Sequence, residues 1–76
     1  MVIAGVLVKT EVGRGEEVLE KLKRVEGVTT YGLHKEINIV TVVEGETAQE
    51  ARRITEEMGK LDGVLGAFPV YISFEG

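Results

Sequence analysis

The chain has 76 residues, a formal net charge of −4 and no cysteine, so it can form one hydrophobic core but no disulfide or cysteine-zinc framework. His34, Asp62 and Ser73 are the only residues of their types, and their spacing gives no indication of a catalytic triad. This composition predicts a binding protein rather than an enzyme, with no cofactor and no metal. The excess of Glu favours a cationic partner over nucleic acid.

No apolar run approaches the roughly 18 residues of a membrane-spanning helix. The segment Met1–Val8 has neither the basic flank nor the small-residue cleavage site of a secretory signal. We therefore expect a cytoplasmic protein without membrane insertion, folded as a single domain over residues 1–76.

The first half of the chain predicts a strand, a helix and a hairpin. Val2–Val8 is β-branched and almost continuously apolar, which is typical of a central strand. Residues 16–25 have apolar side chains at helical spacing, with acids first and bases last, and Gly27 ends this helix. Val28–Leu33 and Ile37–Val43 read as two strands that are joined by a turn at residues 34–36.

The second half of the chain predicts a helix followed by a last strand. Thr47 and Glu50 have the spacing of a capping box, and the apolar stripe that follows extends to Leu61. Asp62 and Gly63 end this helix, and the last strand covers residues 64–73.

The two halves are related by a repeat of 36 residues. Six positions recur at this spacing: Val18/Ile54, Leu22/Met58, Val25/Leu61, Glu26/Asp62, Gly27/Gly63 and Val28/Val64. Two copies of a β-α-β unit predict an α+β, ferredoxin-like βαββαβ fold, in which both helices cover one face of a four-stranded antiparallel sheet. The predicted strand order is fourth, first, third, second, which places Pro69 on an edge strand, where its missing amide donor is tolerated.

The phase of the third strand decides which residues lie on the sheet face without helices. Burying an unpaired Asn costs about 1–3 kcal/mol and an ionised Glu costs more, so Asn38 and Glu44 belong on the open face and Ile39, Thr41 and Val43 on the covered one. The open face is then expected to carry a set of mostly apolar side chains: Ile3, Leu7, Lys9, Tyr31, Leu33, Val40 and Val42. A contiguous patch of this kind predicts a partner or a second subunit.

The sequence resembles the NapD family. The resemblance rests on Ala4–Val8, on the helix end at Val25–Val28, on Ile39–Glu46 and above all on the string Asp62-Gly63-Val64-Leu65-Gly66-Ala67 that leads to Val70-Tyr71. The residues Pro69 and Ile72 depart from the family's usual pattern. Members of this family are cytoplasmic assembly chaperones for the catalytic subunit of periplasmic nitrate reductase.

The resemblance implies that the chain binds the twin-arginine signal peptide of a molybdoenzyme precursor and delays its export until the cofactor is loaded. Such a peptide needs an apolar surface beside carboxylates, because an Arg guanidinium offers a planar fork of donors to two oxygens. The expected peptide-binding residues are the open-face set together with three glutamates, Glu36, Glu44 and Glu46.

Two alternatives use the same fold. The chain also resembles stand-alone Lrp/AsnC-type ligand-binding domains, through Val6–Lys9, Gly13–Val18 and Glu26–Val28, and this resemblance implies a homodimer through the open sheet face that binds amino acids. An acylphosphatase would use an Arg in the first loop and an Asn on a middle strand, for which Arg14 and Asn38 fit superficially. The loop at residues 13–15 is too short for the phosphate cradle of those enzymes.

Overall fold

The computed structural model describes residues 1–74 and confirms the ferredoxin-like fold. The elements follow in the order β1 (Val2–Thr10), α1 (Gly15–Leu22), β2 (Val28–His34), β3 (Asn38–Gly45), α2 (Ala48–Gly59) and β4 (Val64–Phe74). The four strands form one antiparallel sheet in the order β2-β3-β1-β4, as predicted. Both central strands, β1 and β3, are therefore paired on both sides, while β2 and β4 are the edges.

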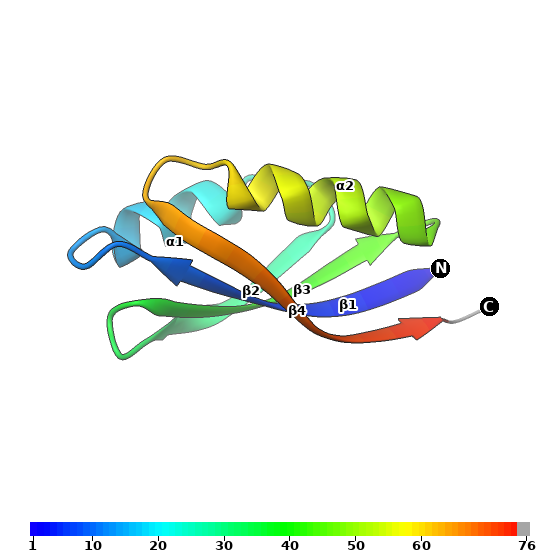
Figure 1. The fold of residues 1–76 in the computed structure, drawn as a ribbon, viewed down its shortest axis with the longest axis horizontal. Coiled ribbons are helices and arrows are strands. Elements are labelled where there is room, and N and C mark those ends of the chain that lie inside the picture. Colours follow the sequence, from blue (N-terminus) through cyan, green and yellow to red (C-terminus); the bar gives the residue numbers. More distant parts are fainter. Residues whose placement is uncertain (75–76) are drawn as a thin grey trace.

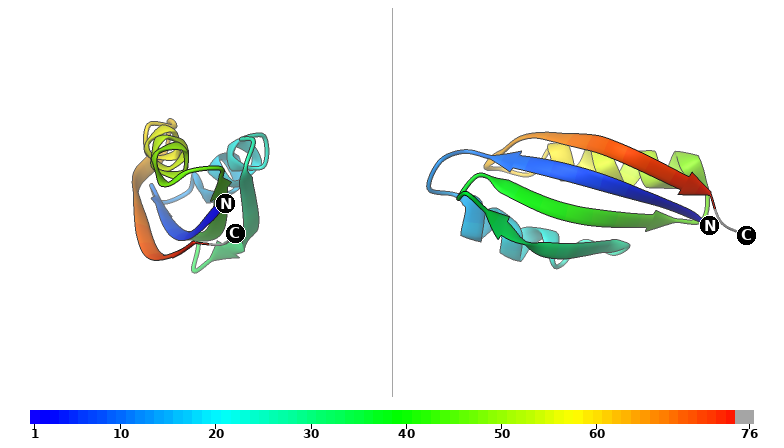
Figure 2. Two further views of the ribbon diagram at one scale, coloured as in Figure 1. Left: turned by 90° about the vertical axis from the view of Figure 1, so that its right-hand side faces the viewer. Right: turned by 90° about the horizontal axis from the view of Figure 1, so that it is seen from below.

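The two helices lie on one side of the sheet and leave the other side bare. Figure 1 shows α1 and α2 as a layer above the strands, and the view from below in Figure 2 looks onto the sheet with the helices behind it. Helix α2 packs against β1, β3 and β4, whereas α1 packs mainly against β2. No helix among residues 1–74 is long and apolar enough to span a membrane.

The hydrophobic core fills the space between the helices and the covered sheet face. Its most buried members come from alternate positions of the central strands and from the inward stripe of each helix: Val2, Ala4, Val6, Val8, Val18, Leu19, Leu22, Ile39, Val43, Ala51, Ile54 and Met58. Thr41 is also fully buried there, and its hydroxyl donates to the carbonyl of Val6 at 2.8 Å. The predicted phase of β3 is therefore confirmed, because Asn38 and Glu44 lie on the opposite face.

The repeat of 36 residues corresponds to the same helix-to-strand turn made twice. Gly27 and Gly63 have φ angles of 87° and 96°, a region that residues with a Cβ rarely adopt. In both turns a valine that follows the glycine donates its amide to the carbonyl three residues earlier, at 3.3 Å for Val28 and 3.1 Å for Val64. The repeat in the sequence therefore corresponds to a repeated structural unit, the turn between a helix and the strand that follows it.

Both helices end earlier than the sequence predicts, and α2 stops at Gly59 rather than at Leu61. Helix α1 stops at Leu22 rather than near Val25, because Arg24 and Val25 bond to carbonyls three residues back in tighter turns. Val25 still packs against the core, which is why its apolar spacing continued the helical pattern. Helix α2 begins as predicted, with the Thr47 hydroxyl accepting the Glu50 amide at 3.1 Å.

Candidate functional site

The helix-free face of the sheet consists of four rows of side chains that run across the strands. Directly paired residues of an antiparallel sheet point to the same side, so the strand registers define these rows. Taken in the order β2, β3, β1, β4, the acidic row holds Glu44, Ile3 and Ser73; the first apolar row holds Thr29, Val42, Gly5 and Tyr71; the second apolar row holds Val40, Leu7 and Phe68; and the basic row holds His34, Asn38, Lys9 and Gly66. Tyr31 of β2 has no directly paired residue, but it stands opposite Val40 and is counted with the second apolar row.

The two apolar rows leave large side chains in contact with solvent. Tyr31 is 59% exposed, Tyr71 52%, Phe68 49% and Val40 42%. Their neighbours Leu7 and Val42 are half-buried between them. A contiguous surface of two tyrosines, one phenylalanine and three aliphatic residues is what a partner with apolar side chains requires.

Two aromatic rings on this face occupy space that glycines leave free. A Cβ placed on Gly5 would come within 2.5 Å of Cδ1 of Tyr71, so the ring covers the backbone of β1 at this residue. A Cβ on Gly66 would come within 2.6 Å of Cζ of Phe68. Over β1 and β4 the face is therefore covered by two aromatic rings that are both about half exposed.

The expectation that Leu33 lies on the open face is wrong. The pairing of β2 with β3 is regular to Thr30 and resumes at Leu33, so Tyr31 and Gly32 together stand opposite the single residue Val40. This bulge, at which Gly32 has φ 96°, turns Leu33 to the covered side, opposite Ile39. There Leu33 packs against the core and against Gly15 at the start of α1.

The remaining residues of the expected set lie on the open face. Strand register and alternation place there six of the seven side chains that the sequence nominated: Ile3, Leu7, Lys9, Tyr31, Val40 and Val42. The sequence-based list omitted Phe68 and Tyr71, although Gly5 inside a continuous apolar strand was a usable signal. An interior strand glycine often marks a place where another group approaches the backbone.

The three nominated glutamates do not lie together. Glu44 ends the open face at the acidic row and Glu46 follows it in the loop after β3, whereas Glu36 lies in the β2–β3 turn at the other end. At about 3.3 Å per residue, β3 separates these two ends by more than about 20 Å. Of the three, only Glu44 and Glu46 are therefore close enough to contact the same part of a bound ligand.

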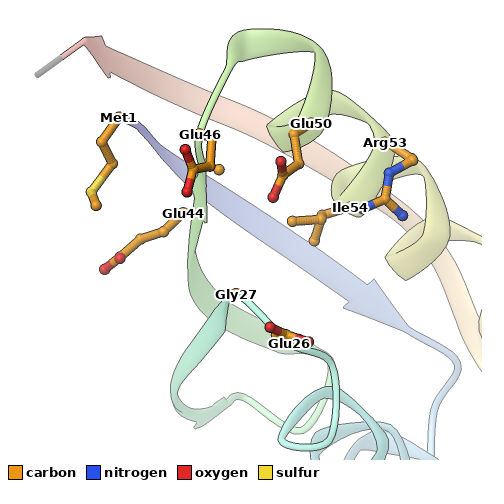
Figure 3. Close-up of a pocket in the computed structure, with 9 residues that line it drawn as sticks. Met1, Glu26, Gly27, Glu44, Glu46, Glu50, Arg53 and Ile54 are labelled. Carbon is orange, nitrogen blue, oxygen red and sulfur yellow. The ribbon is translucent and has the colours of Figure 1, made fainter.

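Glu44 and Glu46 belong to a larger acidic pocket at that end of the sheet. The pocket is lined by Met1, Glu26, Gly27, Glu44, Gly45, Glu46, Glu50, Arg53 and Ile54. Figure 3 shows its carboxylates arriving from three places: the end of β3, the start of α2 and the turn before β2. The lining includes four carboxylates but one guanidinium, that of Arg53, which also donates to Glu57 at 2.9 Å. This end of the molecule attracts cations.

Arg14 is held by carboxylates and is not placed to bind phosphate. Its guanidinium donates to both carboxylate oxygens of Asp62, at 3.2 and 2.8 Å, and also pairs with Glu17. The hydrogen bonds that Arg14 donates lower the pKa of Asp62 and of Glu17, and the same bonds, which the carboxylates accept, raise the pKa of Arg14. A guanidinium neutralised in this way serves the fold, which argues against the acylphosphatase alternative. Residues 1–74 contain no group of three or more His, Asp or Glu placed to hold a metal ion.

Comparison with known proteins gives a family and solved structures of similar fold. The sequence model of the family described as NapD protein matches residues 1–76. The solution structure of the Escherichia coli Tat proofreading chaperone protein NapD superposes with a TM-score of 0.84 at 20% identity, covering 96% of this chain and 78% of that one. The crystal structure of hypothetical protein PHS023 from Pyrococcus horikoshii gives 0.82 at 28% identity, covering 100% and 93%. A comparison with curated protein sequences gives no match.

Proposed function

Because the chain belongs to the NapD family, we propose that it is a cytoplasmic, non-enzymatic proofreading chaperone for the twin-arginine export pathway. In this proposal it binds the signal peptide of the periplasmic nitrate reductase catalytic subunit and delays export until the molybdenum cofactor is loaded. The observation that carries the proposal is the helix-free face, where two apolar rows adjoin the carboxylates of the acidic row and the acidic pocket.

The chemistry of this face matches the two parts of such a peptide. The apolar stretch would cover the exposed side chains of Tyr31, Val40, Phe68 and Tyr71, removing them from water. The arginine pair would meet Glu44 and Glu46, with which guanidinium groups form charge-assisted hydrogen bonds. The net charge of −4 adds a long-range attraction for a cationic segment.

The Lrp/AsnC-type alternative uses the same face differently. A second copy of the chain would cover the apolar rows in place of a peptide. Sedimentation at micromolar concentration separates the two interpretations, because a stable dimer that a twin-arginine peptide does not change would contradict the chaperone proposal.

A titration followed by NMR tests the site itself. A peptide with two adjacent arginines followed by an apolar stretch should shift the amide signals of Leu7, Val40 and Val42, and Val40→Glu should weaken binding at least about tenfold while the fold is kept. Val12→Glu is the matched control, because Val12 is 81% exposed in the loop after β1, outside the four rows. Shifts confined to the outer surfaces of the helices, or equal losses in both variants, would refute the proposed site.

A further inference from the structure

The four rows of the helix-free face carry opposite charge at their two ends. The acidic row ends in Glu44, which also lines the acidic pocket, and the other carboxylates of that pocket lie at the same end of the sheet. The basic row, at the other end of β1, holds Lys9 and His34 on the face itself. In the turn beyond it, Lys35 and Glu36 contribute formal charges that cancel.

The apolar rows lie between these ends, so the face has a direction. From the acidic row to the basic row it runs six residues along β1, from Ile3 to Lys9, or about 20 Å. A segment of about 13 residues spans this length as a helix, and one of about six residues spans it as an extended chain. In either form, a ligand with a cationic end and an apolar middle has one orientation in which charges of opposite sign meet.

We propose that the peptide lies along β1 and β3 in a single orientation, with its arginine pair at the acidic row and its C-terminal part at the basic row. This proposal rests on the function proposed above and adds a direction to it. The reverse orientation would place the two arginines beside Lys9 and would leave the carboxylates of Glu44 and Glu46 without the cations that suit them.

The orientation also determines what each apolar row contacts. The residues just after the arginine pair lie on Val42, Gly5 and Tyr71, where the tyrosine ring occupies the space beside the glycine. The residues further along lie on Val40, Leu7 and Phe68. At the far end Lys9 faces the C-terminal part of the peptide, where the backbone carbonyls of a helical segment would carry partial negative charge.

Spin labels on the peptide measure the orientation directly. A label at the peptide's N-terminus should broaden the amide signals of Ile3 and Gly45, and a label at its C-terminus should broaden those of Lys9 and Asn38. Binding with this pattern reversed would overturn the orientation and leave the proposed function standing. Absence of binding by the unlabelled peptide would instead contradict the proposed function.

Charge reversal gives a second, independent measurement on the folded protein. Glu44→Lys should weaken binding at least about tenfold, and Glu36→Lys should weaken it less. Glu56→Lys, on the outer side of α2, is the control, because it changes the net charge by the same amount away from the proposed site. A larger loss for Glu36→Lys than for Glu44→Lys would overturn the orientation. Thermal unfolding of each variant shows whether a loss of binding comes from the site or from the fold.

Discussion

Tyr71 lies across Gly5, the residue that it faces in the neighbouring strand. The pairing of β4 with β1 puts these residues opposite each other, and the ring occupies the space that a side chain on Gly5 would take. Gly5 is buried for this reason, although it is on the helix-free face. The ring is 52% exposed, so its other side remains available to a partner.

This contact has a direct spectroscopic signature. An aromatic ring held this close changes the local magnetic field through its ring current, so we expect the Gly5 Hα signals to be displaced from their usual position. Tyr71→Ala should return them, whereas Tyr31→Ala, which removes the other tyrosine of the face, should leave them unchanged. A Gly5 signal that does not respond to Tyr71→Ala would show that the ring does not lie on it in solution.

Leu33 leads to the second prediction, because its contribution to the free energy of unfolding depends on which face of the sheet it occupies. On the covered side it packs against the core, and Leu33→Ala should lower the free energy of unfolding by about 2 kcal/mol through lost burial and a residual cavity. Val40→Ala, on the open face, should cost less than about 1 kcal/mol. Urea unfolding measures both variants, and equal small losses would place Leu33 back on the open face.

Much of this fold could be predicted from the alternation of apolar and polar residues in the strands and from the 36-residue repeat. The face on which Leu33 lies could not be predicted in this way. The phase of β3 followed from the cost of burying Asn38 and Glu44, and that phase is correct. The bulge at Gly32 adds one residue to β2 without disturbing the apolar pattern, so only the partner strand reveals that Leu33 has changed sides.

The same difficulty concealed the aromatic residues of β4. Val70 has no partner in β1 between Tyr71 opposite Gly5 and Pro69 opposite Val6, so the strand changes phase at this point. Without that bulge, alternation would put Phe68 and Tyr71 on different faces, and no joint surface would be expected from them. The acidic pocket was only partly foreseen for a related reason, because Glu26 and Glu50 reach it from separate elements.

Gly13 and Gly27 form a matched pair for a third prediction. Their φ angles are 85° and 87°, so Ala at either position bears a similar backbone cost of about 1–2 kcal/mol. A Cβ on Gly13 would meet open space, whereas one on Gly27 would lie 2.9 Å from the carbonyl oxygen of Glu44. The amide of Glu44 also donates to the Gly27 carbonyl at 2.8 Å, so this contact joins the turn to the end of β3.

We therefore expect Gly27→Ala to lower the free energy of unfolding by at least about 1 kcal/mol more than Gly13→Ala. Chemical denaturation with a common slope for both variants measures this difference. Identical losses would mean that the turn relaxes to accommodate the Cβ, and that the backbone conformation alone explains why glycine is present. Faster amide exchange at Glu44 in Gly27→Ala would locate the damage at the acidic end of the face.

The pair formed by Arg14 and Asp62 leads to a prediction about acid. It connects the loop before α1 to the turn before β4, and the hydrogen bonds from Arg14 lower the pKa of the Asp62 carboxyl. A carboxyl whose pKa is lower in the folded than in the unfolded protein stabilises the fold above its unfolded pKa, which is near 3.8. That contribution is lost as the pH falls through the lowered value.

The thermal stability of the unmodified protein should accordingly exceed that of Asp62→Asn at pH 6, and this advantage should shrink steadily below about pH 4. Glu20→Gln is the control, because the ion pair of Glu20 with Lys23 stays within one turn at the end of α1 and connects no distant segments. If the advantage over Asp62→Asn persisted unchanged at pH 2, the ionised carboxylate would not be what holds these two loops together. Melting curves at several pH values and constant ionic strength decide the matter, since added salt weakens exposed ion pairs by itself.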